Sequence, residues 1–373
     1  MKLSFELLSF TLFAPAALAC DCFEFDLPIH VSSTLPKFNV PEFTSSYDST
    51  AFLIGSVSRN ADPTALAGGE GKVDRNFNIH FQYCQPKKAK HSNNVVQILS
   101  HGLGFDKSYW KFGDKETDYI ASATAAGYST LSYDRLGVGK SEQADPYFEV
   151  QLGTQVAILA RITDLIRSGH LSRKVPVPKK VVHVGHSYGS LITNGLVAGQ
   201  PDLSDGIVLT GFSHESAWTT TLELCLGFEV AKINDPARFR HYQTGYLIWG
   251  REFDNQCIFF KHPFFETKYL KQSEAIKAPF AIAELLSFTS VPLAAANFTK
   301  PVLMISGQAD LPFCGGECNG IINGNESASP FVFPSAAPFS TYVHPDAGHG
   351  LNLHHNASSA YKVINSFLSG NDL

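Results

Sequence analysis

The pentapeptide Gly-His-Ser-Tyr-Gly at residues 185–189 constrains the fold of this chain more than any other segment. The β-branched run at 179–184 before it predicts a buried strand, and residues 190–198 after it predict a helix. Between a strand and a helix, Gly-x-Ser-x-Gly is typical of a nucleophile turn, whereas alone it could occur by chance in a glycine-rich chain. The two glycines allow a tight turn. We therefore expect Ser187 to project beyond the strand as a nucleophile.

Strand and helix patterns take turns along the rest of the chain. Strict alternation at 76–83 predicts an antiparallel edge strand. Further strands are expected at 95–99, 129–133, 181–184, 206–210, 301–306 and 340–343. Helices are expected at about 115–126, 150–169, 188–199 and 358–369. This order predicts an α/β fold with a mostly parallel sheet and helices on both faces.

The expected organisation has four parts. Residues 1–19 read as a signal peptide. Residues 20–74 are mostly irregular and polar, with an alternating patch at 52–57 that predicts at most one strand, so they form an N-terminal arm. Residues 75–214 and 301–373 form the α/β core. Residues 215–300 interrupt it after the sixth strand.

The interrupting segment at 215–300 is rich in aromatic residues, which make up fifteen of its 86 positions. A loop of that length is unusual in a compact domain unless it has its own structure. We interpret it as a mostly helical cap over the carboxyl edge of the sheet. The alternative is a peripheral insertion with its own small core, but its position between sheet strands favours the cap.

A serine nucleophile needs a base, and the base needs an orienting carboxylate. Asp310 follows the strand at 301–306, and His349 follows the last strand. The order Ser187, Asp310, His349 is that of α/β-hydrolases, and each residue falls just past the end of a predicted strand. Asp346 is the main rival acid, but it lies too close in sequence to His349 to face it easily.

An acyl-transfer site also needs donors for the oxyanion. We expect these to be the backbone N–H groups of Tyr188, directly after the nucleophile, and of Leu103, in the His-Gly-Leu-Gly stretch at 101–104. The alternative for that stretch is an ordinary glycine turn. The expected substrate contacts are His101, Gly102, His214 and Trp218.

The first residues suggest export from the cell. An apolar stretch at 3–18 follows Lys2 and ends in Ala-Leu-Ala, which predicts a signal peptide cut after Ala19. A membrane anchor is the alternative, but the stretch is short and interrupted. Three glycosylation sequons, at Asn297, Asn325 and Asn356, fit a secreted eukaryotic protein with no anchor after cleavage.

Export to an oxidising compartment favours disulfides. Seven cysteines remain after the predicted cut, at 20, 22, 84, 225, 257, 314 and 318. Cys225 could pair with Cys257, and Cys314 with Cys318. The odd count leaves one thiol free or paired elsewhere. Zinc is a weaker interpretation of the last pair, because no other Cys or His lies near it at ligand spacing.

Composition excludes some classes of partner. The 373 residues are 44% apolar and carry a net charge of −5, so nothing indicates nucleic-acid binding. The Gly-Lys-Ser at 139–141 suggests a phosphate loop only faintly, because Asp134 stands where that loop requires a glycine. Asp134 and Arg135 are expected to brace the loop beside the nucleophile. No cofactor or metal is predicted.

Together these motifs resemble the α/β-hydrolase superfamily, and more narrowly its cap-bearing, secreted, fungal-like branch of serine esterases and lipases. The resemblance covers residues 76–370 and implies an eight-stranded, mostly parallel sheet and an acyl-enzyme on Ser187. The arm at 20–74 and the cysteine-bearing insertion at 313–338 depart from it, and both make transfer of a relative's substrate unsafe.

The expected function is hydrolysis of a moderately apolar, small-molecule carboxylic ester, since an aromatic cap suggests an apolar pocket. The same triad would also serve a lactonase, a thioesterase, an acyltransferase or a cofactor-free perhydrolase. A different class is a binding or receptor protein on a hydrolase scaffold. Substrate identity and oligomeric state do not follow from the sequence.

Overall fold

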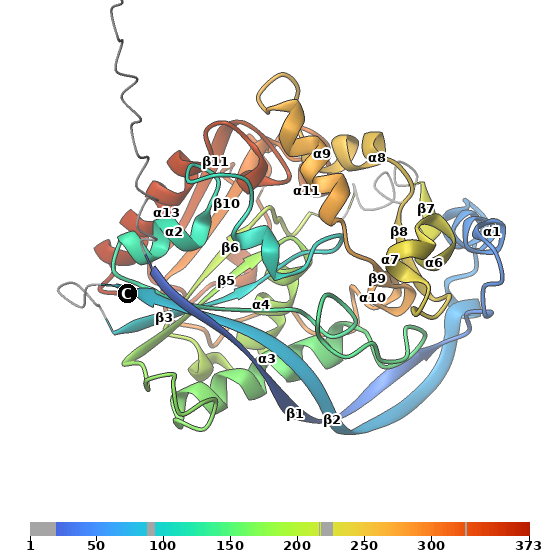
Figure 1. The fold of residues 1–373 in the computed structure, drawn as a ribbon, viewed down its shortest axis with the longest axis horizontal. Coiled ribbons are helices and arrows are strands. Elements are labelled where there is room, and N and C mark those ends of the chain that lie inside the picture. The colour runs from blue at the N-terminus through green and yellow to red at the C-terminus, as the bar shows by residue number, and fades with distance from the viewer. Residues whose placement is uncertain (1–19, 88–93, 216, 218–226, 325–326) are drawn as a thin grey trace, which may run out of the picture.

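A twisted eight-stranded sheet runs through the middle of the molecule (Figure 1). The computed structural model describes residues 20–87, 94–215, 217, 227–324 and 327–373. The strand order is β1-β2-β4-β3-β5-β6-β10-β11. β1 pairs antiparallel with β2, and β2 with β4, while the other five pairs are parallel. The mostly parallel eight-stranded sheet is therefore confirmed.

The strands and helices outside the segment at 215–300 match most of the predicted ranges. The strands are β1 (Cys20–Phe38), β2 (Ala67–Pro86), β3 (Val95–Ser100), β4 (Ser129–Tyr133), β5 (Lys180–His186), β6 (Gly206–Thr210), β10 (Val302–Ala309) and β11 (Phe339–Gly348). The α-helices are α1 (Ser46–Val57), α2 (Tyr119–Ala125), α3 (Leu152–Arg167), α4 (Tyr188–Gly199), α11 (Leu311–Cys314), α12 (Ser329–Val332) and α13 (Ala357–Gly370). Short 3₁₀ turns are η1 (Pro63–Leu66), η3 (Lys107–Trp110), η4 (Pro201–Leu203) and η5 (Leu351–Leu353).

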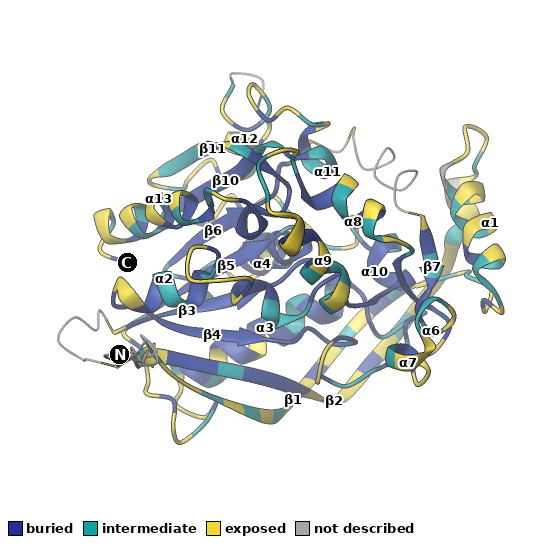
Figure 2. Ribbon diagram, turned by 45° about the horizontal axis from the view of Figure 1, so that its top comes forward, coloured by how far each residue is buried: buried dark blue, intermediate teal, exposed yellow. Residues whose placement is uncertain are grey.

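Helices cover both faces of the sheet because alternate strand residues point to opposite sides. Val181 and Ile207 belong to one apolar cluster, which includes residues of α3 and α4. Their neighbours Val182 and Val208 belong to the second cluster, which includes residues of α2 and α13. Figure 2 shows the central strands buried between these layers. The predicted arrangement of helices on both faces is confirmed.

The N-terminal arm differs from its prediction. Residues 20–38, expected to be irregular, form β1, which pairs with β2 along almost its whole length. The sheet edge is therefore β1, and the strand predicted at 76–83 is part of β2, one position inward. The signal was present, since Phe23, Phe25, Leu27, Ile29 and Val31 alternate with other residues, as in a half-buried strand.

The patch predicted as a strand at 52–57 lies in helix α1 instead. This helix begins with a capping box, in which the Ser45 hydroxyl accepts from the Asp48 N–H and the Asp48 carboxylate accepts from the Ser45 N–H. Such a box satisfies two otherwise unpaired donors at a helix start. The capping box therefore favours a helix here more strongly than the short alternation at 52–57 favours a strand.

The segment predicted as a cap is only partly helical. It contains an antiparallel sheet of β7 (Phe228–Val230), β8 (Tyr246–Trp249) and β9 (Phe280–Ala281). Its helices are α6 (Ala231–Asn234), α7 (Pro236–Phe239), α8 (Glu252–Phe259), α9 (Thr267–Ile276) and α10 (Ile282–Leu286). The strand formers Tyr246, Ile248 and Trp249 make up most of β8 and are buried there.

The arm reaches this segment. α1 lies beside β7 (Figure 1), where the Ser46 hydroxyl accepts a hydrogen bond from the Val230 N–H at 3.2 Å. Within the described part of the chain, no helix has the length and apolar character needed to cross a membrane.

Candidate active site

Ser187 lies at a strained turn between β5 and α4. Its φ of 56° and ψ of −121° are unusual for a residue with a side chain. A Cβ on Gly189 would collide with the Ser100 carbonyl, and one on Gly185 with the backbone of the turn. The Ser187 N–H donates to the Thr210 carbonyl at 2.9 Å and fixes the turn against β6. The predicted glycine requirement therefore has a direct steric cause.

Asp310 and His349 form a buried pair. His349 Nδ1 donates to Asp310 Oδ2 at 2.7 Å, and their side chains are 2% and 0% exposed. A carboxylate can only accept, so Nδ1 carries the proton and Nε2 is left to accept one. The second oxygen of Asp310 accepts from the Phe313 N–H at 3.0 Å, which holds the carboxylate in place.

The rival acid lies elsewhere. The Asp346 carboxylate is about half exposed and lies 3.6 Å from the Lys261 ammonium. His354, five residues after His349, is a structural residue, because its Nε2 accepts from the N–H groups of Lys261 and Gly348. The geometry therefore joins His349 to Asp310.

The His349 imidazole lies between two aromatic rings. The rings of Phe259 from α8 and Phe313 from α11 each stack on it, with centroids 5.6 Å away and planes 27° apart. Such packing restricts the orientation of the imidazole and excludes water from its faces. Sequence reasoning missed both phenylalanines, because nothing local in the sequence marks them.

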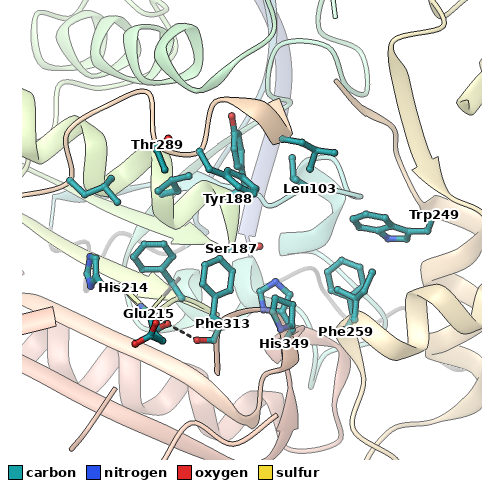
Figure 3. Close-up of a pocket in the computed structure, with 18 of the residues that line it drawn as sticks. Leu103, Ser187, Tyr188, His214, Glu215, Trp249, Phe259, Thr289, Phe313 and His349 are labelled. Carbon is teal, nitrogen blue, oxygen red and sulfur yellow. Dashed lines mark hydrogen bonds between the residues drawn. The ribbon is translucent and has the colours of Figure 1, made fainter. Parts of the chain in front are cut away.

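The predicted oxyanion residues line the same cavity as Ser187 and His349 (Figure 3). Tyr188 is the first residue of α4, so its N–H has no acceptor within the helix. Leu103 follows Gly102, where a Cβ would lie only 2.8 Å from the Ser187 Cβ. Glycine at 102 therefore lets the loop after β3 lie directly against the nucleophile turn.

His101 does not line the cavity. Its Nδ1 lies 2.9 Å from the Gly102 carbonyl, and its Nε2 accepts from the Arg135 N–H at 3.0 Å. Burial, together with the Arg135 charge, lowers the pKa of His101 well below its usual value, so the ring is neutral. His101 therefore supports the loop at 101–104 from behind and does not face the cavity, where a substrate contact was predicted.

His214 does line the cavity, but both of its ring nitrogens are engaged. They lie 2.8 Å from the Ser329 hydroxyl and 2.8 Å from Asn194 Oδ1. Burial lowers the pKa of His214 to about 4, which keeps the ring neutral at physiological pH. Trp218 lies outside the described residues, so its role stays a prediction.

The cavity has a volume of about 200 Å³ and mostly apolar walls. The segment at 215–300 supplies Phe228, Trp249, Phe259 and Phe288 to these walls. The aromatic content of this segment predicted an apolar pocket, but the sequence did not identify which of the aromatic residues face the site. The indole of Trp249 also packs against Gly104, where no Cβ could fit.

Asp134 and Arg135 lie where a bracing role was expected. The Asp134 carboxylate accepts from the N–H groups of Lys107 and Lys140 at 3.0 and 2.9 Å. A Cβ on Gly139 would collide with this carboxylate. The carboxylate therefore fills the space next to the loop at 137–141.

Disulfides occupy two places in the described chain, at Cys22–Cys84 and Cys314–Cys318. The second was predicted and is confirmed, whereas Cys225 lies outside the described residues and its pairing stays a prediction. Among those residues, only Cys20, Cys22 and Cys84 lie close enough together to suggest a metal site. The disulfide removes two of those thiols as ligands.

Comparisons with known proteins agree with this fold. A model of the alpha/beta hydrolase family matches residues 97–360. The chain is similar in structure to an esterase from Thermogutta terrifontis, with a TM-score of 0.53, 14% identity and coverage of 80% of this chain and 96% of that one. No curated protein matches the chain in sequence.

Two further solved structures carry other activities in their names. A bromoperoxidase from Bacillus anthracis has a TM-score of 0.53 and 18% identity, covering 79% of this chain and 96% of that one. An enol-lactonase from Burkholderia xenovorans has a TM-score of 0.50 and 18% identity, covering 79% and 97%. At such identities the likeness concerns the fold alone.

Proposed function

The chain belongs to the alpha/beta hydrolase family, and from this premise we propose that it is a serine hydrolase of carboxylic esters. The observation that carries the proposal is the buried Asp310–His349 pair, whose imidazole lines one cavity together with Ser187 at its strained turn. A nucleophile, a base and an orienting carboxylate are the three groups that acyl transfer through a serine requires.

The proposed reaction has two halves. His349 Nε2 takes the proton of the Ser187 hydroxyl as its oxygen attacks the ester carbonyl, then gives that proton to the leaving alcohol. Water attacks the acyl-enzyme in the same way and regenerates the serine. Asp310 holds the imidazole and stabilises its charge, and the N–H groups of Leu103 and Tyr188 stabilise the oxyanion.

The substrate we propose is a moderately apolar ester. The aromatic walls of the cavity favour an apolar acyl or alcohol group, which gains about 25 cal/mol for each Å² removed from water. The segment at 215–300 supplies walls of the cavity, and this and the His-Gly-Leu-Gly loop also support a place in the cap-bearing esterase and lipase branch.

We further propose that the protein is secreted. The two disulfides fit an oxidising compartment. Asn297 is exposed and can accept a glycan, whereas the Asn356 amide donates to the Pro345 carbonyl and is less free to do so. Expression through a eukaryotic secretory pathway should give a chain that begins at Cys20 and loses mass with an N-glycosidase. An uncleaved, unglycosylated product would contradict secretion.

The decisive experiment is labelling by a fluorophosphonate, read by intact mass, followed by an ester panel of varied acyl length. Ser187→Ala should stay folded and lose both labelling and turnover, because no hydroxyl remains to form the acyl-enzyme. Ser190→Ala, which removes a neighbouring hydroxyl on α4, is the control and should still label. Residual turnover in Ser187→Ala would refute the nucleophile, and labelling without turnover of any ester would favour a receptor role.

A further inference from the structure

One buried cation touches both sides of the proposed oxyanion site. Arg135 follows β4, and its side chain is fully buried. Its Nη2 donates to the Gly102 carbonyl at 3.3 Å, and its guanidinium lies over the Tyr188 ring at 4.9 Å from the centroid. Its own backbone N–H also fixes His101, the second group bonded to the Gly102 carbonyl.

The partner of this cation comes from the segment at 215–300. Glu284 in α10 pairs with Arg135, and its side chain is 1% exposed. The same carboxylate accepts from Gln155 Nε2 at 3.0 Å and from the Ala281 N–H at 3.1 Å. An apolar pair of similar volume would often be at least as stable as a buried ion pair. Stability alone therefore gives no reason for this charge pair.

The geometry of one peptide bond supplies a reason. The Gly102 carbonyl and the Leu103 N–H belong to the same planar trans peptide, so they point in opposite directions. Arg135 and His101 both bond the carbonyl, and neither of them lines the cavity that Leu103 lines. Fixing the carbonyl therefore fixes the direction of the N–H that the oxyanion would use.

We propose that Arg135 and Glu284 are positioning residues that aim the Leu103 N–H at the oxyanion, so that the cap segment completes the catalytic site. This proposal rests on the proposed serine-hydrolase function. It gives the segment at 215–300 a second role beside lining the cavity. The pair touches no substrate itself and acts through the Gly102–Leu103 peptide.

The test replaces both charges at once. In Arg135→Met/Glu284→Leu no unpaired charge is left in the interior, so the variant should fold. Its kcat should fall about 10- to 100-fold with little change in KM, because the donor acts mainly in the transition state. Removing one such donor outright costs about 10²–10³, and His101 still holds the carbonyl in part.

A second readout separates positioning from general loosening. The Ki of a trifluoromethyl ketone, which forms a tetrahedral adduct on the serine, should rise by the same factor as kcat/KM falls. The Ki of an unreactive alcohol that fills the apolar cavity should stay unchanged. The control is Arg167→Met/Asp205→Leu, which removes an ion pair between α3 and the residue before β6, outside the cavity. It should alter neither constant.

Each outcome decides the proposal. A folded double variant with wild-type kcat, or with both Ki values raised equally, would overturn it. If that variant does not fold, Arg135→Lys and Glu284→Gln are measured instead, and loss of fold in all three would assign the pair a purely structural role. A wild-type protein that neither labels at Ser187 nor hydrolyses esters would refute the proposed function instead.

Discussion

Asp310 uses its two carboxylate oxygens for two different partners. One accepts from the His349 imidazole and the other from the Phe313 N–H, so the carboxylate orients the imidazole and caps α11 at the same time. The carboxyl group is fully buried and therefore depends on both bonds. Asp346, three residues from His349 in sequence, faces Lys261 instead.

This difference predicts a ranking of two matched variants. Asp310→Asn should lower kcat by about 10⁴-fold, because the amide favours the wrong imidazole tautomer while its oxygen can still cap α11. Asp346→Asn should change kcat less than about twofold, since only an exposed ion pair is lost. Steady-state kinetics on one activated ester checks both. The reverse ranking would mean that the acid is Asp346.

At the scale of elements, the segment at 215–300 supplies the walls of the cavity. Trp249 from β8 lies against the proposed oxyanion loop at Gly104 and lines the cavity near Phe228 and Phe259. Its side chain is large, apolar and almost fully buried. A substrate group that reaches this wall would lose a large contact if the indole were removed.

Trp249→Ala should therefore change kcat/KM unequally across esters. We expect a loss of about 10- to 200-fold for bulky esters and a smaller loss for acetate esters, which do not reach the wall. Phe253→Ala, an exposed aromatic on the neighbouring α8, is the control and should leave the ratio unchanged. Equal losses on all esters would show that Trp249 supports the fold and does not select substrates.

We expect Cys22–Cys84 to contribute more to stability and Cys314–Cys318 to contribute more to activity. Cys314 and Cys318 lie four positions apart in sequence at the Asp310 end of β10, whereas Cys22 in β1 and Cys84 in β2 lie 62 positions apart. In the chain-entropy model these loops contribute about 2 and about 4 kcal/mol. The disulfide that stabilises the fold more therefore lies far along the chain from the proposed triad.

Replacing each pair by alanine tests this contrast. Cys22→Ala/Cys84→Ala should lower the melting temperature more, and Cys314→Ala/Cys318→Ala should lower kcat more, because it frees the end of α11, the helix that carries Phe313. Calorimetry and kinetics on the two variants measure both effects. A kcat loss confined to the first variant would contradict a role for the second disulfide near His349.

At the scale of the whole molecule, buried histidines make stability depend on pH. Burial lowers the pKa of His183 to about 3 and those of His214 and His354 to about 4. In the unfolded chain they titrate at about 6.5. As pH falls from about 6.5 towards 4, the unfolded state binds more protons, so the free energy of unfolding falls by about 1.4 kcal/mol per pH unit for each histidine.

Melting temperatures between pH 4.5 and 7 should therefore fall steadily with acidity. His183→Gln should reduce the slope of stability against pH by the contribution of one proton. His170→Gln, at an exposed position, should leave that slope unchanged. His183 bonds Thr163 and Ser204, so its variant is also less stable at pH 7 and only the slope is compared. A melting temperature that rises towards pH 4.5 would contradict the argument.

The sequence by itself determined the tight turn at Ser187, the order of strands and helices along the core and the chain order of the proposed triad. These follow from local rules: apolar periodicity, and glycines where a Cβ would collide with the Ser187 turn. It also contained two further local patterns, the alternation that predicts β1 and the capping box that predicts the start of α1.

Only the tertiary structure decided which distant residues meet. Arg135 and Glu284 lie 149 positions apart, and Phe259 and Phe313 reach His349 from different elements. Such contacts depend on how the chain packs: Glu284 stands as a single charge in an apolar run, but that run does not indicate which cation it meets. Only the packing brings it to Arg135, because a charge in the interior must find an opposite charge.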